Sequence, residues 1–508
     1  MTPETTRPPP RSWLLPGLAL ATAALHLLFA HRYGYFRDEL YFIACGQRLD
    51  WGYVDQPPFI AAAARLSTAL FGHSLTGLRV LPALASAGLV ALTGHLARRF
   101  GGGGFAVALA ALPAALAPIF LFQGHTLTMN AFEPLLWTGC AALLVHLVST
   151  KQPRLWLALG ALAGVGMLNK YSMAFFSVCL VLGVLLTPAR RLLASRWLVL
   201  GVLLATALVL PNLLWQHGHG WPMLELLRNG QLHKNAPFQL GDFVRGQLLL
   251  LHPLSAPLWL TGLGVLLFAP ALRPYRALGF TYVLLVGLLV FLRAKDYYLA
   301  PAYPMLLAAG AVQAERLIQR PVARAAVLIP GLAGFAALAP LTLPVLPVNT
   351  FISWQRTLGI APPQHERHEY GVLPQHYADQ HGWEQLVASV AKVYQRLPPE
   401  QRARTTLFAQ NYGEAGALDW LGAAHGLPPA RSGHNQYFLW GPGDAAGNLL
   451  VVGGELEELQ PVCTHVELAA RVPSNPYVMP YENNLPLYLC SGLKVPLATL
   501  WPRVKHYE

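Results

Sequence analysis

Long apolar runs separated by short polar connections fill the first two thirds of the chain. A membrane-spanning helix needs about 17–25 mainly apolar residues, and eleven runs reach or approach that length. They lie near residues 13–30, 77–97, 105–122, 129–148, 155–169, 171–187, 197–215, 256–270, 277–292, 297–315 and 325–347. The pattern predicts a polytopic α-helical membrane protein with about eleven transmembrane helices over residues 1–348.

The pattern changes after residue 349, where polar and apolar positions become mixed. Residues 405–410 and 448–452 have strand-like composition, and 383–397 shows helical periodicity. We therefore expect residues 349–508 to form a small α/β domain outside the membrane. Two long loops, 31–76 and 216–255, should lie on the same side, and the first contains an apolar-faced segment suited to the membrane interface.

Composition supports the membrane assignment and changes how the net positive charge is interpreted. The 508 residues are 54% hydrophobic and only 12% charged, and the mean hydropathy is +0.40. A formal net charge of +12 would suggest a nucleic-acid partner in a soluble protein. Here the basic residues lie mostly in short connections between apolar runs, where they act as topology signals, and no nucleic-acid-binding motif is present.

The basic connections predict an orientation. If Arg7 and Arg11 lie in the cytoplasm, every even-numbered span ends at a short basic connection on that side. These connections are 98–99, 151–154, 190–196, 273–276 and 316–324. An odd number of spans then places the C-terminal domain outside the cytoplasm, where an oxidising compartment would allow Cys463 and Cys490 to form a disulfide.

Unusual polar residues gather on the predicted outer face. They are Asp38, Glu39 and Asp55 in the first loop, Asn130 and Glu133 at the start of the fourth span, Lys170 between spans five and six, His217 and His219 at the second long loop, and Arg293, Lys295 and Tyr297 between spans nine and ten. Polar groups at membrane depth are costly and tend to be functional. Sugar transfer from a lipid phosphate needs a carboxylate to accept a proton and cations to hold the leaving phosphate.

The order of these motifs resembles family 39 of the glycosyltransferases, which has the multi-span C-type (GT-C) fold. The family includes protein mannosyltransferases, aminoarabinose transferases acting on lipid A and rhizobial galacturonosyltransferases. The resemblance rests on the pair Asp38-Glu39, on Asp55 before Gln-Pro-Pro, and on the basic run 293–298 before two prolines. It covers about residues 15–320. Asn130 stands where the family often has aspartate, and Asn169-Lys170 matches a Thr-Lys pair only in part.

The resemblance implies a role for each position. Asp38 would be the general base or would align the acceptor hydroxyl, with Glu39 and Asp55 in the same catalytic group. Other implied roles fall into three sets: donor phosphate binding by Lys170, Arg293 and Lys295, acceptor or substrate binding by Asn130, Glu133 and Tyr297, and a divalent metal ion held by Asp55 with His217, His219 or Glu133. Inversion by a single displacement is also implied.

Structural roles compete with each of these assignments. Asp38 could cap the following helix, and Asp55 could form a turn. Asn130 and Glu133 could join helices, while the cations near the tyrosines could be interfacial anchors. The two histidines could belong to an ordinary surface loop, because their spacing is not diagnostic of a metal site.

The sequence therefore predicts an enzyme, an integral membrane glycosyltransferase on the outer face of a bacterial inner membrane. It would move a sugar from a polyprenyl-phosphate donor to a lipid, glycan or protein acceptor of the cell envelope. The main alternative is a transporter or flippase of lipid-linked sugars, although the repeated halves common in transporters are not evident. A ligand-binding receptor anchored by its spans is a second alternative.

Overall fold

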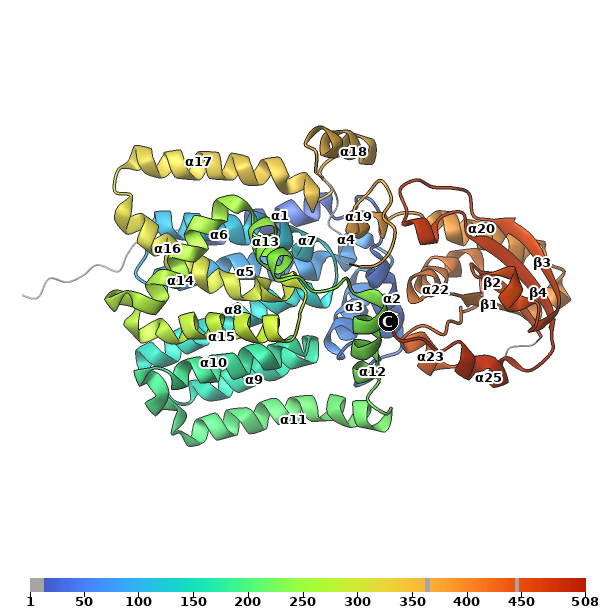
Figure 1. The fold of residues 1–508 in the computed structure, drawn as a ribbon, viewed down its shortest axis with the longest axis horizontal. Helices are drawn as coiled ribbons and strands as arrows, with labels where there is room; N and C mark the ends of the chain where they lie inside the picture. Colours follow the sequence, from blue (N-terminus) through green and yellow to red (C-terminus); the bar gives the residue numbers. More distant parts are fainter. Residues whose placement is uncertain (1–12, 361–365, 444–446) are drawn as a thin grey trace, which may run out of the picture.

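The computed structural model describes residues 13–360, 366–443 and 447–508. Arg7 and Arg11, which support the predicted orientation, lie outside the described residues. Figure 1 shows a bundle of long helices at one end and a β-sheet with its own helices at the other. The short helices α2 (Arg37–Gln47), α3 (Phe59–Phe71) and α4 (Leu75–Leu78) lie between these two parts.

Every predicted apolar span overlies a helix of the bundle. These helices are α1 (Leu14–Phe29), α5 (Val80–Arg99), α6 (Gly104–Leu116), α7 (Pro118–His125), α8 (Met129–Thr150), α9 (Leu155–Asn169), α10 (Ser172–Leu185), α11 (Arg196–Gly218), α14 (Ala256–Phe268), α15 (Arg276–Phe291), α16 (Tyr303–Leu317) and α17 (Pro321–Leu338). Among the described residues, five helical segments are long and apolar enough to cross a membrane, or seven if two bent pairs count as one span each. The chain is thus a multi-pass helical membrane protein, and the count of eleven spans stays a prediction.

One of the expected straight spans is bent, a second bent pair joins the loop 216–255 to the eighth span, and proline is present at both bends. The third span divides into α6 and α7, which meet at 62°. Pro118 begins α7, and the residue before a proline is driven into extended backbone, as Ala117 is here with ψ 140°. The other bent pair comprises α13 (Leu240–Leu250) and the segment from Pro253 to Phe268, which meet at 88°.

Glycines allow some of the helices to approach backbone to backbone. A Cβ added at Gly262 of α14 would lie 1.9 Å from the carbonyl oxygen of Leu306 in α16. Gly310 on α16 meets the carbonyl of Leu258 in the same way, again at 1.9 Å. Small residues at such crossings are typical of helix packing in membranes, where backbone proximity supplies van der Waals contact.

The predicted basic connections gather at one end of the bundle. Tyr275 places its ring 5.3 Å from that of Phe100 and its hydroxyl 2.9 Å from Ser149 Oγ. The Arg154 guanidinium lies 5.5 Å from the ring centre of Trp197. In Figure 1 these loops lie at the end of the bundle away from the β-sheet. This arrangement is the one that the positive-inside pattern requires.

The C-terminal part contains a four-stranded mixed sheet. The helices and strands of this C-terminal part are α18 (Val348–Thr357), α19 (Gln375–Ala378), α20 (Trp383–Arg396), α21 (Pro399–Ala403), β1 (Thr405–Ala409), α22 (Tyr412–Trp420), α23 (Gln436–Trp440), β2 (Asn448–Val452), α24 (Leu456–Leu459), β3 (Cys463–Arg471), β4 (Pro486–Leu493) and α25 (Leu497–Leu500). The strand order is β1-β2-β4-β3. β1 and β2 are parallel, and β4 is antiparallel to both of its neighbours. The predicted helix 383–397 and the two predicted strands are present, whereas β3 and β4 were not predicted.

The two faces of this sheet bury different side chains, because successive residues of a strand point to opposite sides. Leu407 and Leu450 pack toward α20 and α22, while Phe408 and Leu449 belong to a separate cluster with Trp501. On that second side a disulfide joins Cys463 of β3 to Cys490 of β4. The sequence allowed this pairing without establishing it, and the structure contains it.

One hydrophobic core joins the first outer loop to the C-terminal part. Tyr41 and Ile43 of α2 and Ile60 of α3 belong to the same buried cluster as Leu386 of α20 and Leu418 of α22. Burial of apolar surface contributes about 25 cal/mol per Å², so this shared core attaches the loop firmly to the sheet domain. Any polar residue on α2 is therefore held against the C-terminal part as well as the bundle.

Candidate functional site

Two carboxylates of the first long loop form the acidic side of the site. Asp38 lies in the first turn of α2, and Asp55 lies in the turn before α3. Asp38 Oδ1 accepts a hydrogen bond of 3.0 Å from the Tyr412 hydroxyl, and Asp55 Oδ1 accepts one of 2.7 Å from the Tyr41 hydroxyl. Both carboxylates are only partly buried. They are therefore fixed in direction but open to a ligand.

Their surroundings tune both groups toward neutral pH. Burial raises the pKa of Asp55 to about 6, although the hydrogen bond from Tyr41 opposes this. Burial also raises the pKa of Asp38, against the opposing charge of Arg37 and the hydrogen bond from Tyr412. A carboxylate with a raised pKa can accept a proton at neutral pH more readily than an ordinary aspartate, which suits a general base.

A lysine of the second long loop acts electrostatically on these carboxylates. Lys234 ends the short π-helix η2 (Gly230–Lys234), and its charge lowers the pKa of both Asp38 and Asp55. The segment that carries it pairs with the chain after α18, where the Arg367 backbone N–H donates to the Lys234 carbonyl at 3.1 Å. The acidic side of the site therefore has a cation close to it.

Glu366 connects Lys234 to the predicted cation Lys295. The Lys295 ammonium lies 3.5 Å from Glu366 Oε1, and His368 Nε2 lies 3.1 Å from Glu366 Oε2. Burial opposes ionisation of Glu366, but Lys234 and Lys295 outweigh it and hold the pKa of this carboxyl below its ordinary value. The ammonium groups of both lysines thus belong to one charged network beside the acids.

A second group of predicted residues continues this network into the bundle. Lys170 donates to Asn130 Oδ1 at 2.7 Å and to Glu133 Oε2 at 2.9 Å. Its ammonium also lies over the rings of Tyr297 and Tyr298, at 5.4 and 4.3 Å from their centres. Tyr297 is within electrostatic reach of Glu366 as well as Glu133. Four residues predicted from separate motifs therefore lie together.

Glu39 lies apart from this network, and its surroundings favour a structural role over the catalytic one that the resemblance implies. Its carboxylate is fully buried and accepts hydrogen bonds from Arg79 Nε (3.0 Å) and Nη2 (2.8 Å). The backbone N–H groups of Phe36 and Leu127 donate to it as well, at 2.8 and 2.9 Å. A carboxylate with four donors and no exposed surface has a structural role.

Three other predicted residues also lie apart from the network. Arg293 is exposed, and it has a positive φ of 52°. His217 is exposed near Trp221, and His219 stacks on the Trp215 ring at 4.1 Å, with Nδ1 2.8 Å from the Trp215 carbonyl oxygen. These positions give no support to phosphate binding by Arg293.

The predicted metal ligands do not gather. Within residues 13–360, 366–443 and 447–508, no three histidine, cysteine, aspartate or glutamate side chains are placed to hold one ion. The Tyr41 hydroxyl occupies one oxygen of Asp55, and His219 is turned toward Trp215. The set Asp55, His217 and His219 therefore does not fit a metal ion, and we assign no step to one.

Several members of the site were not predicted from the sequence. Lys234 carried a signal, because a lysine in an outer loop runs against the positive-inside pattern. Glu366 lies in a charged run that follows the last predicted span. Tyr41 and Tyr412 gave no such signal, since a tyrosine beside apolar residues is typical of an ordinary hydrophobic core.

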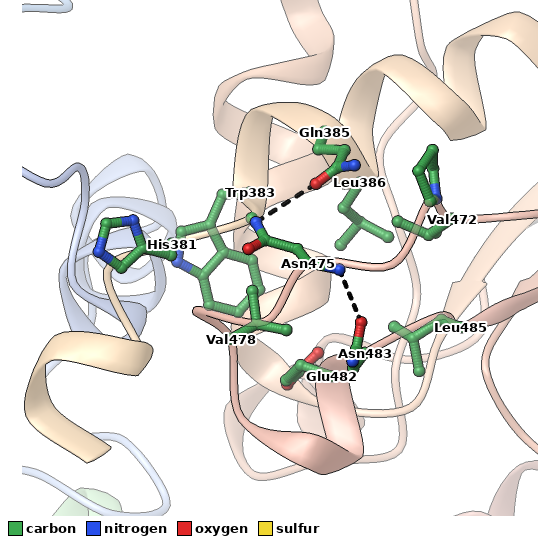
Figure 2. Close-up of a pocket in the computed structure, with 12 residues that line it drawn as sticks. His381, Trp383, Gln385, Leu386, Val472, Asn475, Val478, Glu482, Asn483 and Leu485 are labelled. Carbon is green, nitrogen blue, oxygen red and sulfur yellow. Dashed lines mark hydrogen bonds between the residues drawn. The ribbon is translucent and has the colours of Figure 1, made fainter. Parts of the chain in front are cut away.

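The C-terminal part contains a pocket of its own (Figure 2). Its walls come from the start of α20 and from the segment 472–485. The amides that line it bond to one another: Asn475 Nδ2 donates to Gln385 Oε1 at 3.3 Å, and the Asn475 backbone N–H donates to Asn483 Oδ1 at 2.9 Å. These amides are therefore already engaged within the domain, and we assign no ligand to the pocket.

Comparison with known proteins agrees with this architecture. The family model described as dolichyl-phosphate-mannose-protein mannosyltransferase matches residues 55–215. The structure of ArnT from Cupriavidus metallidurans matches with a TM-score of 0.60, covering 94% of this chain and 97% of ArnT at 16% identity. The chain has the GT-C fold of membrane glycosyltransferases. ArnT bound to undecaprenyl phosphate matches this GT-C chain equally well, with a TM-score of 0.59, 16% identity, and coverage of 94% of this chain and 98% of ArnT.

A curated relative is similar over a shorter region. The lipid A galacturonosyltransferase RgtD of Rhizobium johnstonii is 30% identical over 217 residues. That region is 41% of this chain and 44% of RgtD, so the match spans less than half of the relative. Together with the family model and the ArnT fold, it confirms the resemblance inferred from the sequence motifs.

Proposed function

We propose that this GT-C protein transfers a sugar from a polyprenyl-phosphate donor to a hydroxyl of a cell-envelope acceptor. One observation carries the proposal: the partly exposed carboxylates Asp38 and Asp55 lie within the electrostatic influence of Lys234, whose charge also acts on Glu366, the ion-pair partner of Lys295. A base beside a phosphate-binding surface is what this reaction needs.

The carboxylates would accept the proton that the reaction releases. Asp38 takes the proton of the acceptor hydroxyl while the acceptor oxygen attacks the anomeric carbon. The bond from that carbon to the phosphate oxygen breaks, and its electron pair leaves with the polyprenyl phosphate. A single displacement of this kind inverts the anomeric centre. The charge of Asp55 would favour the positive charge that develops on the sugar.

The cations would hold the phosphate as it leaves. Lys234 and Lys295 share Glu366, so an incoming phosphate can take over part of that ion pair. Lys170 is held by Asn130 and Glu133 beside two tyrosine rings. These groups would orient the lysine and the sugar. The solved ArnT complex with undecaprenyl phosphate supports a polyprenyl phosphate as the donor lipid.

We propose a lipid acceptor of the envelope before a glycan or protein acceptor. The support is RgtD, whose name assigns it lipid A as acceptor and which matches at 30% identity. ArnT supports the same fold for the whole chain but, at 16% identity, not the same sugar. The sugar therefore stays open within the proposal.

The proposed orientation places the site on the outer face of the inner membrane. The basic connections lie at the far end of the bundle from the sheet domain (Figure 1), which is the cytoplasmic end by the positive-inside rule. The Cys463–Cys490 disulfide suits an oxidising compartment for the sheet domain. Eleven spans, with the C-terminal α/β domain 349–508 outside, are part of this proposal.

The test is transfer of labelled sugar by the full-length protein in lipid nanodiscs, from polyprenyl-phosphate sugars to extracted envelope lipids. Asp38→Asn should abolish transfer, because the carboxylate can no longer accept a proton. Asp50→Asn is the matched control: Asp50 lies in the same loop but bonds the Trp215 indole at 2.8 Å. If Asp38→Asn transfers sugar as fast as Asp50→Asn, the proposal is wrong. Movement of lipid-linked sugar without transfer would favour the transporter.

A further inference from the structure

We propose that Tyr412 and Gln436, both from the C-terminal part, are positioning residues for the two carboxylates Asp38 and Asp55. This inference rests on the proposed transfer reaction and deepens it. It means that the site is not complete within the membrane bundle. The sheet domain would supply the groups that aim the carboxylates.

The first contact joins α22 to the proposed base. The Tyr412 hydroxyl donates to Asp38 Oδ1 at 3.0 Å, across 374 residues of sequence. The Tyr412 ring is itself held between the Arg37 guanidinium, 4.9 Å from its centre, and the Tyr41 ring at 4.7 Å. Because these two contacts fix the Tyr412 ring, its hydroxyl is held pointing toward the Asp38 carboxylate.

Close backbone packing holds α22 in place against α2. A Cβ added at Gly413 would lie 2.6 Å from Arg37 Cγ, and one at Gly416 would lie 2.9 Å from the Leu40 carbonyl carbon. These glycines are three residues apart and therefore lie on one face of the helix. The face that touches α2 has no room for larger side chains, so the helix that carries Tyr412 sits directly on the helix that carries Asp38.

The start of α22 is fixed independently from the other side. Asn411 caps the helix, because its Oδ1 accepts from the backbone N–H groups of Gly413 and Glu414 at 2.9 and 3.0 Å. Its Nδ2 donates to Glu482 Oε1 at 2.9 Å, and Glu482 lines the pocket drawn in Figure 2. An N-cap contributes about 0.5–2 kcal/mol to a helix, so Tyr412 begins a well-anchored helix.

The second contact reaches Asp55 through Tyr41. The Gln436 backbone N–H donates to the Tyr41 hydroxyl at 3.2 Å, while that hydroxyl donates to Asp55 at 2.7 Å. Gln436 Oε1 also accepts from the Val54 backbone N–H at 3.1 Å. The residue before Asp55 and the tyrosine that bonds it are thus both held by one buried residue of α23. Because α23 belongs to the sheet domain, that domain sets the position of the second carboxylate too.

The chemistry predicts how the loss of these contacts would appear. A hydroxyl that donates to a carboxylate stabilises its charged form, and the Tyr412 bond lowers the pKa of Asp38. Removing the hydroxyl should therefore move the acidic limb of the pH–rate profile to higher pH. It should also let the carboxylate turn away from the acceptor, which lowers kcat. Binding of the donor phosphate depends on other residues, so its KM should not change.

The experiment compares Tyr412→Phe with Tyr437→Phe in the full-length protein in nanodiscs. Tyr437 is a matched control, since its hydroxyl donates to a different carboxylate, Asp419 Oδ2, at 2.9 Å. We expect Tyr412→Phe to lower kcat about tenfold to a hundredfold, as for a lost hydrogen bond to a charged group. The donor KM should stay constant and the acidic limb should move up. Gln436→Leu keeps the backbone N–H that bonds Tyr41 but removes the side-chain acceptor of the Val54 N–H, so it should lower kcat in the same direction.

Each other outcome overturns part of the argument. If Tyr412→Phe matches Tyr437→Phe in kcat and in pH profile while Asp38→Asn is inactive, the inference is wrong and the proposed function stands. If Tyr412→Phe and Tyr437→Phe lower kcat equally and the acidic limb of the pH–rate profile moves in neither variant, their effect is structural. The inference is then again wrong. If Asp38→Asn is fully active, the proposed function has failed first.

Discussion

Substitution of Glu39 tests whether Asp38 and Glu39, the acidic pair of the first loop, have different roles. Asp38 and Glu39 are neighbours, yet only Glu39 is fully buried, and it accepts hydrogen bonds from the Arg79 guanidinium and two backbone N–H groups. Changing Glu39 to alanine would leave the Arg79 charge, which is 1% exposed, without its counterion. Glu39→Ala should therefore lower the stability of the protein, whereas Asp38→Ala should lower the rate of sugar transfer.

The size of the effect follows from the contacts. Removing one partner of a buried ion pair costs about 3–5 kcal/mol. Arg79 would keep three acceptors, the carbonyl oxygens of Ala30 at 2.8 Å and Gly34 at 2.7 Å and His125 Nε2 at 3.2 Å, which places the cost near the lower end, about 3 kcal/mol. Against a total stability of about 5–15 kcal/mol for a typical domain, this is a large loss.

The assay is thermal unfolding in nanodiscs, followed by transfer activity of the protein that remains folded. We expect Glu39→Ala to melt well below the wild type and Asp38→Ala to melt near it. Per folded molecule, Glu39→Ala should keep more transfer activity than Asp38→Ala. If Glu39→Ala melts with the wild type but transfers nothing, Glu39 is catalytic after all and the structural assignment is refuted.

Three further predictions concern the rest of the site and the sheet domain. The pKa of Asp55 is raised from 3.8 to about 6. If the reaction needs the charged form of Asp55, kcat/KM should fall as the pH drops through about 6. A pH–rate profile measures this fall. Lys234→Met should raise the donor KM about tenfold, the effect of roughly 1.4 kcal/mol, whereas Lys505→Met, which removes a surface ion pair with Glu225, should not. Replacing Cys463 and Cys490 by serine should destabilise the sheet domain by about 3–4 kcal/mol, from the 27-residue separation that the bond closes, as measured by thermal unfolding with and without reductant.

The helices were predictable because their signal is local. An apolar run of membrane length must form a helix to satisfy its own backbone groups, and each predicted run overlies one. The bends were less predictable, since Pro118 can begin a helix or be tolerated within a longer one. β3 and β4 were missed because the exposed, polar residues of β3 give no clear alternation.

The site was predictable only where charge stood out against the membrane. Asn130, Glu133 and Lys170 were each conspicuous at a span end, and they lie within hydrogen-bonding distance of one another. Tyr412 lies 374 residues from Asp38 in sequence, and nothing local marks it as a partner of that residue. The same limit applies to Glu39, because the sequence does not show that Arg79 lies opposite it.

Three consecutive charged residues show why the first loop is built as it is. Successive helix residues point about 100° apart, so Arg37, Asp38 and Glu39 face three directions. Arg37 faces the sheet domain, where its guanidinium donates to the Tyr481 hydroxyl at 2.9 Å, and Glu39 faces the bundle through Arg79. Asp38 is left between them, pointing into the site. A single helical turn thus fixes the base to both parts of the molecule, and a change that loosened either attachment would move the carboxylate without touching it.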